Sequence, residues 1–177
     1  MPEATAIVAN ADFLDSDVAA YVSRFGMVGV ARAFPKRSIV NGGPGLPSTV
    51  DAMRTTFDVE TLMGMSGSAP HVYEIPSMRR DADILDAYEQ ILSDDAVAAV
   101  ASDFGGCENS FGDNFPLLAD GLALQGSSLG ITFYAPSGNA TAVSARCPSG
   151  VEAPASAPHF VAVGGSDLVL NGIRKLA

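Results

Sequence analysis

The sequence predicts an α/β fold built on a parallel, doubly wound β-sheet. Apolar stretches of strand length alternate along the whole chain with segments whose apolar residues recur at helical spacing. The apolar run at 96–101 is of the kind that is buried on both faces in a parallel sheet. Strands that alternate with helices pair in parallel through right-handed crossovers, and this places helices on both faces of the sheet.

Six strands are expected, and most of them are bounded by turns rich in glycine, proline or asparagine. They lie at residues 5–9, 28–34, 70–75, 96–101, 129–135 and 160–163. The loop at 40–47 contains too much glycine and proline for regular structure. In a sheet of this kind the chemistry lies beyond the carboxyl ends of the strands, so the loops after Val40, Ala101 and Ala135 are the informative ones.

The first two predicted helices have recognisable starts. Asp15 or Ser16 is expected to cap the first, which ends at Gly26. Ser48, with Asp51 three residues later, begins the second in the manner of a capping box. We expect this helix to carry Val50, Met53 and Phe57 together on one apolar face.

Two further helices follow in the second half of the chain. Asp81 is expected to cap the third, whose apolar face carries Ile84, Leu85, Tyr88, Ile91 and Leu92. The fourth is marked by Phe115, Leu118 and Leu122.

Composition limits the class of protein. The chain has 177 residues, 47% of them hydrophobic, and no apolar run approaches the roughly 18 residues of a membrane-spanning helix. We therefore expect one globular domain over residues 1–177, with no membrane partner. Lys and Arg number 10 against 20 Asp and Glu, a net charge of −10. This balance argues against nucleic acid as a partner, because nucleic acid is bound by basic surfaces.

The first residues and the cysteines bear on the compartment. The chain opens Met1-Pro2-Glu3 without a basic segment, so no secretory signal is expected in it. Cys107 and Cys147 both lie in loop-like segments, which favours a disulfide in an oxidising compartment over two buried thiols. In the chain-entropy model that bond contributes roughly 4 kcal/mol. Neither the cysteines nor His71 and His159 show the close spacing of a zinc site.

Three local patterns are interpreted as structural. The loop at 42–45 matches neither phosphate-binding glycine motif. Residues 126–130 match G-x-S-x-G, but they lie between a helix and the following strand, whereas a nucleophile elbow runs from strand into helix. His71 and His159 each stand at the start of a strand with no carboxylate at a suggestive spacing, so both are interpreted as structural or surface histidines.

Four segments together are more specific. They are 57–60 (Phe-Asp-Val-Glu), 102–108 (Ser-Asp-Phe-Gly-Gly-Cys-Glu), 137–139 (Ser-Gly-Asn) and 153–165, which ends Phe-Val-Ala-Val-Gly-Gly. In order and spacing they resemble the sedolisin family of serine-carboxyl peptidases. The resemblance implies a subtilisin-like α/β fold, truncated at its C-terminal side, that corresponds to about the first half of a family catalytic domain. It also implies cleavage of peptide bonds in acid and an extracellular location.

The resemblance assigns a role to Asp58, which falls on the family's helix aspartate that orients a glutamate acting as general base. That glutamate belongs one helical turn earlier, where this chain has Arg54. An arginine beside Asp58 is expected to form an ion pair and to lower the pKa of the carboxyl. Glu60 is no substitute for the missing glutamate, because it lies about 200° around the helix from Asp58.

Asn139 falls on the family's oxyanion-hole aspartate, and an asparagine can donate a hydrogen bond there at any pH. Alternatively, Asn139 is a loop residue or the acceptor of a glycosylation sequon. The family's nucleophile lies in a Gly-Thr-Ser-x-x-x-Pro motif that this chain does not contain. Ser166 matches a structural segment and is not that serine. The family's calcium site lies further on still, so no cofactor or metal is expected in this chain.

The prediction is therefore a sedolisin-like serine-type peptidase domain that is inactive as this isolated chain, since the nucleophile and the glutamate base are missing. An alternative is a non-catalytic module that binds peptides or proteins on the same fold. A third is an unrelated doubly wound domain that binds an anion or nucleotide. The expected partners are a peptide or unfolded protein, and a second copy or another protein over the uncovered C-terminal side.

Overall fold

The computed structural model describes residues 4–27, 34–45, 49–77, 80–138, 147 and 150–165. The strands are β1 (Thr5–Ala9), β2 (Lys36–Ile39), β3 (His71–Glu74), β4 (Ala99–Ser102), β5 (Thr132–Pro136) and β6 (Phe160–Val163). The helices are α1 (Asp15–Arg24), α2 (Thr49–Ser66), α3 (Asp81–Asp94), the short 3-10 helix η2 (Glu108–Ser110) and α4 (Phe115–Leu129). Within these ranges no helix combines the length and the apolar character needed to cross a membrane.

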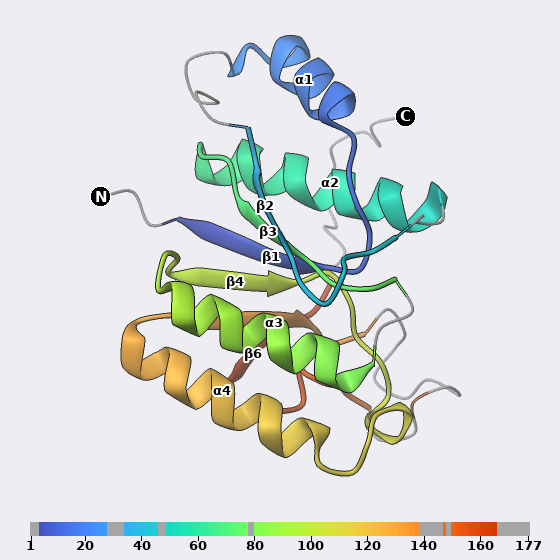
Figure 1. Ribbon diagram of the computed structural model, residues 1–177, viewed down its shortest axis with the longest axis vertical. Coiled ribbons are helices and arrows are strands. Elements are labelled where there is room, and N and C mark those ends of the chain that lie inside the picture. Colours follow the sequence, from blue (N-terminus) through green and yellow to red (C-terminus); the bar gives the residue numbers. More distant parts are fainter. Residues whose placement is uncertain are drawn as a thin grey trace, which may run out of the picture.

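The strands form one six-stranded sheet in the order β2-β3-β1-β4-β5-β6. Every neighbouring pair is parallel, as the alternation of strands and helices predicted. Helices α1 and α2 lie on one side of the sheet and α3 and α4 on the other (Figure 1). The predicted doubly wound α/β fold is confirmed.

Strand β1 shows how helices cover both faces of the sheet. Ala6 and Val8 belong to a core cluster with residues of α3 and α4. The alternate residues Ile7 and Ala9 belong to a second cluster with residues of α1 and α2. Successive side chains of a strand point to opposite faces, so a strand covered on both faces is apolar throughout. This is why residues 5–9 could be recognised as a buried strand.

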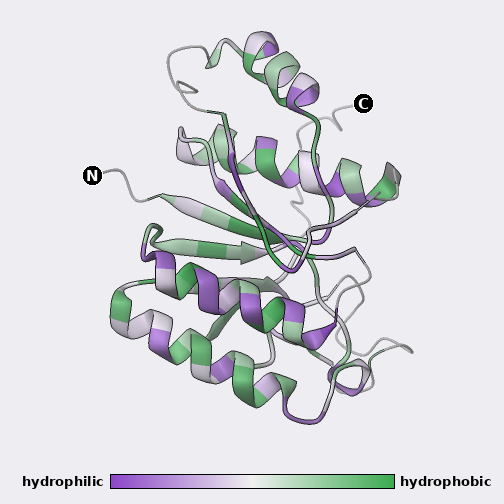
Figure 2. Ribbon diagram, in the orientation of Figure 1, coloured by the Kyte–Doolittle hydropathy of each residue, from purple (hydrophilic) through white to green (hydrophobic). Residues whose placement is uncertain are grey.

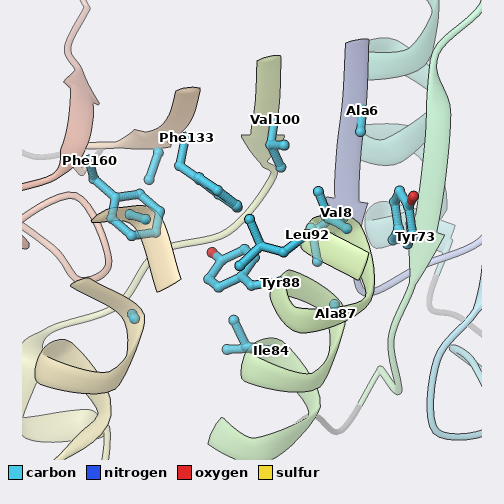
Figure 3. Close-up of a cluster of buried hydrophobic side chains, with 14 of the residues drawn as sticks. Ala6, Val8, Tyr73, Ile84, Ala87, Tyr88, Leu92, Val100, Phe133 and Phe160 are labelled. Atoms are coloured by element: carbon cyan, nitrogen blue, oxygen red, sulfur yellow. The ribbon is translucent and has the colours of Figure 1, made fainter. Parts of the chain in front are cut away.

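The larger core lies between the sheet and the helices α3 and α4. Tyr88 of α3 meets Phe133 edge to face, with ring centroids 5.1 Å apart, and Phe160 lies beside both rings (Figure 3). Helices α3 and α4 mix hydrophobic and hydrophilic residues along their length (Figure 2), as expected of helices with one buried and one solvated face. The predicted apolar face of α3 is confirmed, since all its members but the partly buried Leu85 are fully buried.

The opposite face of the sheet is not covered at its far end. Tyr134 of β5 is 37% exposed, and Val161 and Val163 of β6 are 43% and 51% exposed. Parallel sheets are ordinarily covered on both faces. In the part of the chain that the structure describes, α1 and α2 pack over the β1 and β3 end instead.

The predicted apolar face of α2 is wrong. Val50, Met53 and Phe57 are each more than 60% exposed, and the helix buries Val59 and Met63 against β1 and β3 instead. Apolar residues occur on two sides of this helix, so periodicity alone does not decide which side faces the sheet. The contact with Ile7 and Val72 selects the Val59 side. The helix runs through Gly64 and ends at Ser66.

The strand β2, over Lys36–Ile39, was not predicted. The strand expected at 28–34 is not tested, because 28–33 lie outside the described residues. β2 pairs with β3 alone, at the edge of the sheet, so charged residues such as Lys36 are tolerated there and the apolar signal is weak.

The helix caps also differ from the prediction. Leu14 stands at the N-cap position of α1, and Arg80 stands at the N-cap position of α3.

Candidate functional site

An open pocket lies at the edge of the sheet formed by the carboxyl ends of the strands. Its volume is about 600 Å³. It is lined by Arg54, Phe57, Asp58, Ser102, Asp103, Phe104, Gly105, Pro136, Gly138 and Glu152. The loops after β4 and β5 contribute to it as the fold class predicted, whereas no described residue of the loop after Val40 lines it. The middle of α2 forms the facing wall.

Helix α2 presents three residues to the pocket. Arg54, Phe57 and Asp58 stand three and four positions apart, which places them on one helical face. The neighbouring Thr55 is fully buried, and its Oγ1 donates a hydrogen bond to Oδ2 of Asp103 at 3.0 Å. The backbone N–H of Asp103 in turn donates to the carbonyl of Val8 at 3.2 Å. The wall is therefore tied to the central strands.

Arg54 does not pair with Asp58, contrary to the sequence expectation. Its Nη2 lies 3.4 Å from Oδ1 of Asp51, on the exposed side of the helix. Burial raises the pKa of Asp58 above its ordinary value, and the positive charge of Arg54 only partly opposes this rise. The expected lowering of the pKa is wrong because desolvation of the carboxylate outweighs an arginine that is engaged elsewhere.

Glu60 lies away from the pocket. Its pKa is raised, first by burial and then by the negative charge of Asp17 on α1. Its carboxyl therefore faces α1 and does not line the pocket. This agrees with the prediction that Glu60 does not replace the missing glutamate.

Glu152 is a pocket residue that the sequence reasoning missed. Its side chain lies between the loops after β4 and β5, where a Cβ on Gly105 would approach its Oε2 to 2.7 Å. A Cβ on Gly138 would approach Cγ, Cδ and Oε1 to 3.2 Å. The one signal in the sequence was an acidic residue immediately before the 153–165 segment, and nothing in its spacing linked it to Asp58.

Hydrogen bonds of the main chain hold Glu152 in this position. Its N–H donates to the carbonyl of Ser137 at 3.2 Å. The next residue, Ala153, forms an antiparallel bridge with Gly106, with N–H donors and carbonyl acceptors 2.7 and 3.1 Å apart. The loops after β4 and β5 and the segment before β6 are thus joined at the pocket.

Ser102, His71 and His159 each lie within hydrogen-bond distance of another described side chain. Ser102, which lines the pocket, lies 2.7 Å from the Tyr88 hydroxyl through its Oγ. Residues 126–129 form the last turn of α4, so the G-x-S-x-G pattern there is no nucleophile elbow. His71 is buried and lies 2.8 Å from Ser38 Oγ. Nδ1 of His159 lies 3.0 Å from Oδ1 of Asp120, a carboxylate that its sequence spacing did not indicate.

The two cysteines lie together although they are far apart in sequence. Cys107 and Cys147 are both buried thiols. A hydrogen bond with the Cys147 thiol, burial and the nearby Glu152 carboxylate raise the pKa of Cys107 to about 11. The structure therefore places these sulfurs next to one another beside the pocket, and the disulfide itself stays a prediction.

Several residues named from the sequence lie outside the described part of the chain. Among them are Ser48, expected to begin the second helix, Asn139, the expected oxyanion donor, and Ser166. Gly138, which precedes Asn139, does line the pocket. Among the residues that the structure does describe, no three His, Cys, Asp or Glu side chains gather closely enough to hold a metal ion, so no metal ligands are assigned.

A second charged cluster lies outside the pocket, at the ends of β1 and β3. Nε of Arg37 lies 3.2 Å from both Asp12 Oδ1 and Glu74 Oε1, and its Nη1 lies 2.9 Å from Asp15 Oδ1. Glu74 is 2% exposed. Burial raises the pKa of Glu74 to about 7, with a further rise from Asp12 that Arg37 opposes.

Comparison with known proteins relates the chain to one class of fold. No family model matches the sequence, and no curated protein matches it. Among solved structures, the chain is similar to Pseudomonas sedolisin, a serine-carboxyl proteinase determined in complex with two molecules of pseudo-iodotyrostatin. The TM-score is 0.76 at 18% sequence identity, over 96% of this chain and 50% of the other. The chain thus has a sedolisin-like fold and spans about half the length of that protein.

Proposed function

We propose that the chain is a sedolisin-like peptidase portion that binds peptide segments in the pocket beside α2 and does not by itself cleave them. The observation that carries this proposal is the pocket itself. It lies at the carboxyl ends of the strands, where ligands bind in this class of sheet. It also contains Asp58, which the sequence resemblance assigns to the position of the family's catalytic aspartate.

The pocket is suited to a peptide. It is open, and it combines the rings of Phe57 and Phe104 with charged groups on two walls. Phe57 is 66% exposed, so its ring is accessible to a ligand in the pocket. A peptide supplies both the apolar groups and the polar groups that such a surface can bind.

Absence of cleavage follows from the chemistry of the described residues. A serine peptidase needs a base to take the proton of its nucleophile. Arg54, at the base position, is always protonated and cannot accept that proton. The family's serine motif does not occur among the 177 residues. Asp58 would then orient a group that this chain does not supply, and Asn139 would supply the oxyanion donor only once a nucleophile was present.

Peptide binding can be tested with a pair of variants on one helix. Phe57→Ala removes an aromatic ring from the pocket wall, whereas Met65→Ala removes an exposed side chain further along α2, 85% exposed and outside the pocket. A fluorescent peptide library is titrated with each protein, and anisotropy is measured. We expect Phe57→Ala to weaken binding at least about tenfold and Met65→Ala to leave it unchanged. Equal affinities would contradict binding in this pocket.

A partner over the open face of the sheet is a second proposal, favoured by the exposed Tyr134, Val161 and Val163 of β5 and β6. A second copy of the chain would cover this apolar surface. Light scattering across a concentration series tests it. A dimer that Val161→Asp dissociates is expected, and a monomer at every concentration would contradict it. An extracellular location is proposed from the same resemblance, together with the paired cysteines.

A further inference from the structure

We propose that Glu152 makes the pocket selective for a positively charged side chain, a lysine or arginine of the bound peptide. This inference rests on the proposed function, since it names the class of peptide that the same pocket binds. It follows from the position of Glu152 and from the charges around it.

The position of Glu152 depends on two glycines. Any side chain at Gly105 would collide with its carboxylate, and any at Gly138 would press on its Cγ and Cδ. Its own N–H and the following Ala153 are fixed by main-chain hydrogen bonds to the loops on either side. The carboxyl group therefore lies close to both loops at the pocket wall.

Across the described ranges no side chain forms a hydrogen bond or ion pair with the carboxylate of Glu152, although the residue is only partly exposed. The other two carboxyl groups of the pocket, those of Asp103 and Asp58, differ from that of Glu152. Asp103 accepts the Thr55 hydroxyl, and burial raises the pKa of Asp58. A half-buried carboxylate without a partner is a favourable site for a cation.

The balance of charge points the same way. Among the described residues, the pocket carries the carboxyls of Asp58, Asp103 and Glu152 against the guanidinium of Arg54, and Arg54 pairs with Asp51. An ammonium or guanidinium entering the pocket reduces this excess of negative charge, whereas a carboxylate would add to it. The exposed ring of Phe57 can pack against the methylene stem of a lysine or arginine.

The test compares matched peptides on matched variants. The probes are fluorescent, end-capped pentapeptides of alanine whose central residue is lysine, arginine, norleucine or glutamate. Anisotropy titrations are made with the wild type, with Glu152→Gln, and with Glu89→Gln as a control, since Glu89 is exposed on α3 away from the pocket. We expect the wild type to bind the lysine and arginine peptides about tenfold more tightly than norleucine, the range of one charge-assisted hydrogen bond. Glu152→Gln should reduce this ratio below about threefold, and Glu89→Gln should not.

The possible outcomes separate this inference from the proposed function. Peptides that bind with no preference for lysine, or a preference that survives in Glu152→Gln, would overturn the inference and leave peptide binding intact. If no peptide binds the wild type, both fail together. Raising the salt concentration should weaken the lysine peptide more than the norleucine peptide.

A second variant tests the position of the Glu152 carboxylate while its charge is kept. Gly105→Ala is expected to displace the Glu152 carboxylate and so reduce the preference for lysine, without removing the charge. In the double variant Gly105→Ala with Glu152→Ala the collision is gone, and stability should recover relative to Gly105→Ala alone. If Gly105→Ala retained the full lysine preference, the placement of Glu152 would not be what produces it.

Discussion

Oγ1 of Thr55 lies 3.0 Å from Oδ2 of Asp103, and this one hydrogen bond joins helix α2 to the loop after β4 at the base of the pocket. Thr55 is fully buried. It lies one residue from Arg54 and three from Asp58, so the position of both side chains depends on where this contact holds the helix.

Removing the Thr55 hydroxyl should therefore affect both stability and binding. Thr55→Val keeps the shape of the side chain but deprives a carboxylate oxygen of its donor, which costs about 1 to 3 kcal/mol. Urea unfolding measures the free energy, and peptide anisotropy measures the pocket. Thr56→Val, one position along the same helix, is the control and should change neither by a comparable amount. A Thr55→Val protein as stable as the wild type would show that the Thr55–Asp103 hydrogen bond does not contribute to the free energy of unfolding.

The pKa of Asp58 should respond to the residue one turn earlier. In the wild type, Arg54 opposes the rise that burial causes. Arg54→Met removes that opposition, and Arg54→Glu adds a like charge, so the titration midpoint of Asp58 should increase in the order wild type, Met, Glu. Carbon-13 NMR of the Asp58 carboxyl follows each midpoint. The same midpoint in all three proteins would mean that residue 54 does not face Asp58.

Glu74 should make stability depend on pH. Its pKa lies at about 7 in the folded protein against an ordinary value of 4.5, so the folded state holds a proton that the unfolded state has lost between these values. Stability is fully present below about 4.5 and falls as the pH rises through about 7. Glu74→Gln stays neutral, so the fall should be smaller in that variant. Urea unfolding across this range, with Glu89→Gln as control, measures the difference.

Oxidation should join the neighbouring thiols of Cys107 and Cys147. The raised pKa of Cys107, about 11, keeps it protonated at neutral pH, so we expect the bond to form slowly with mild oxidant and faster under alkaline conditions. The oxidised protein should resist urea more strongly, by up to roughly 4 kcal/mol. Mass spectrometry of peptide digests identifies the bond. Failure to oxidise, with both thiols accessible to alkylation in the folded protein, would argue against their contact.

The sequence predicted the fold better than the side chains of the site. Buried strands such as β1 are apolar on both faces, and that local pattern is visible without tertiary information. Edge strand β2 lacks the pattern, so it was not predicted. Helix α2 has apolar residues on two sides, and only contact with Ile7 and Val72 selects one of them.

At the site, Asp58 was found through its resemblance to a family motif, and the structure places it in the pocket. Glu152 was missed because its role depends on two glycines far from it in sequence. The expected Arg54–Asp58 pair failed because Asp51 is another carboxylate within reach of the same guanidinium. Helical spacing shows which groups can meet, and competition among neighbours decides which do.

Cleavage of a mixed peptide library tests the central claim most directly. The purified chain and Asp58→Ala are incubated with the library from about pH 3 to about pH 8, the range over which carboxyl and histidine groups titrate, and products are read by mass spectrometry. We expect no cleavage by either protein at any pH, together with binding of peptides to the wild type. Cleavage by the wild type that is lost in Asp58→Ala would contradict the account, because it would mean that this chain holds a working nucleophile and base.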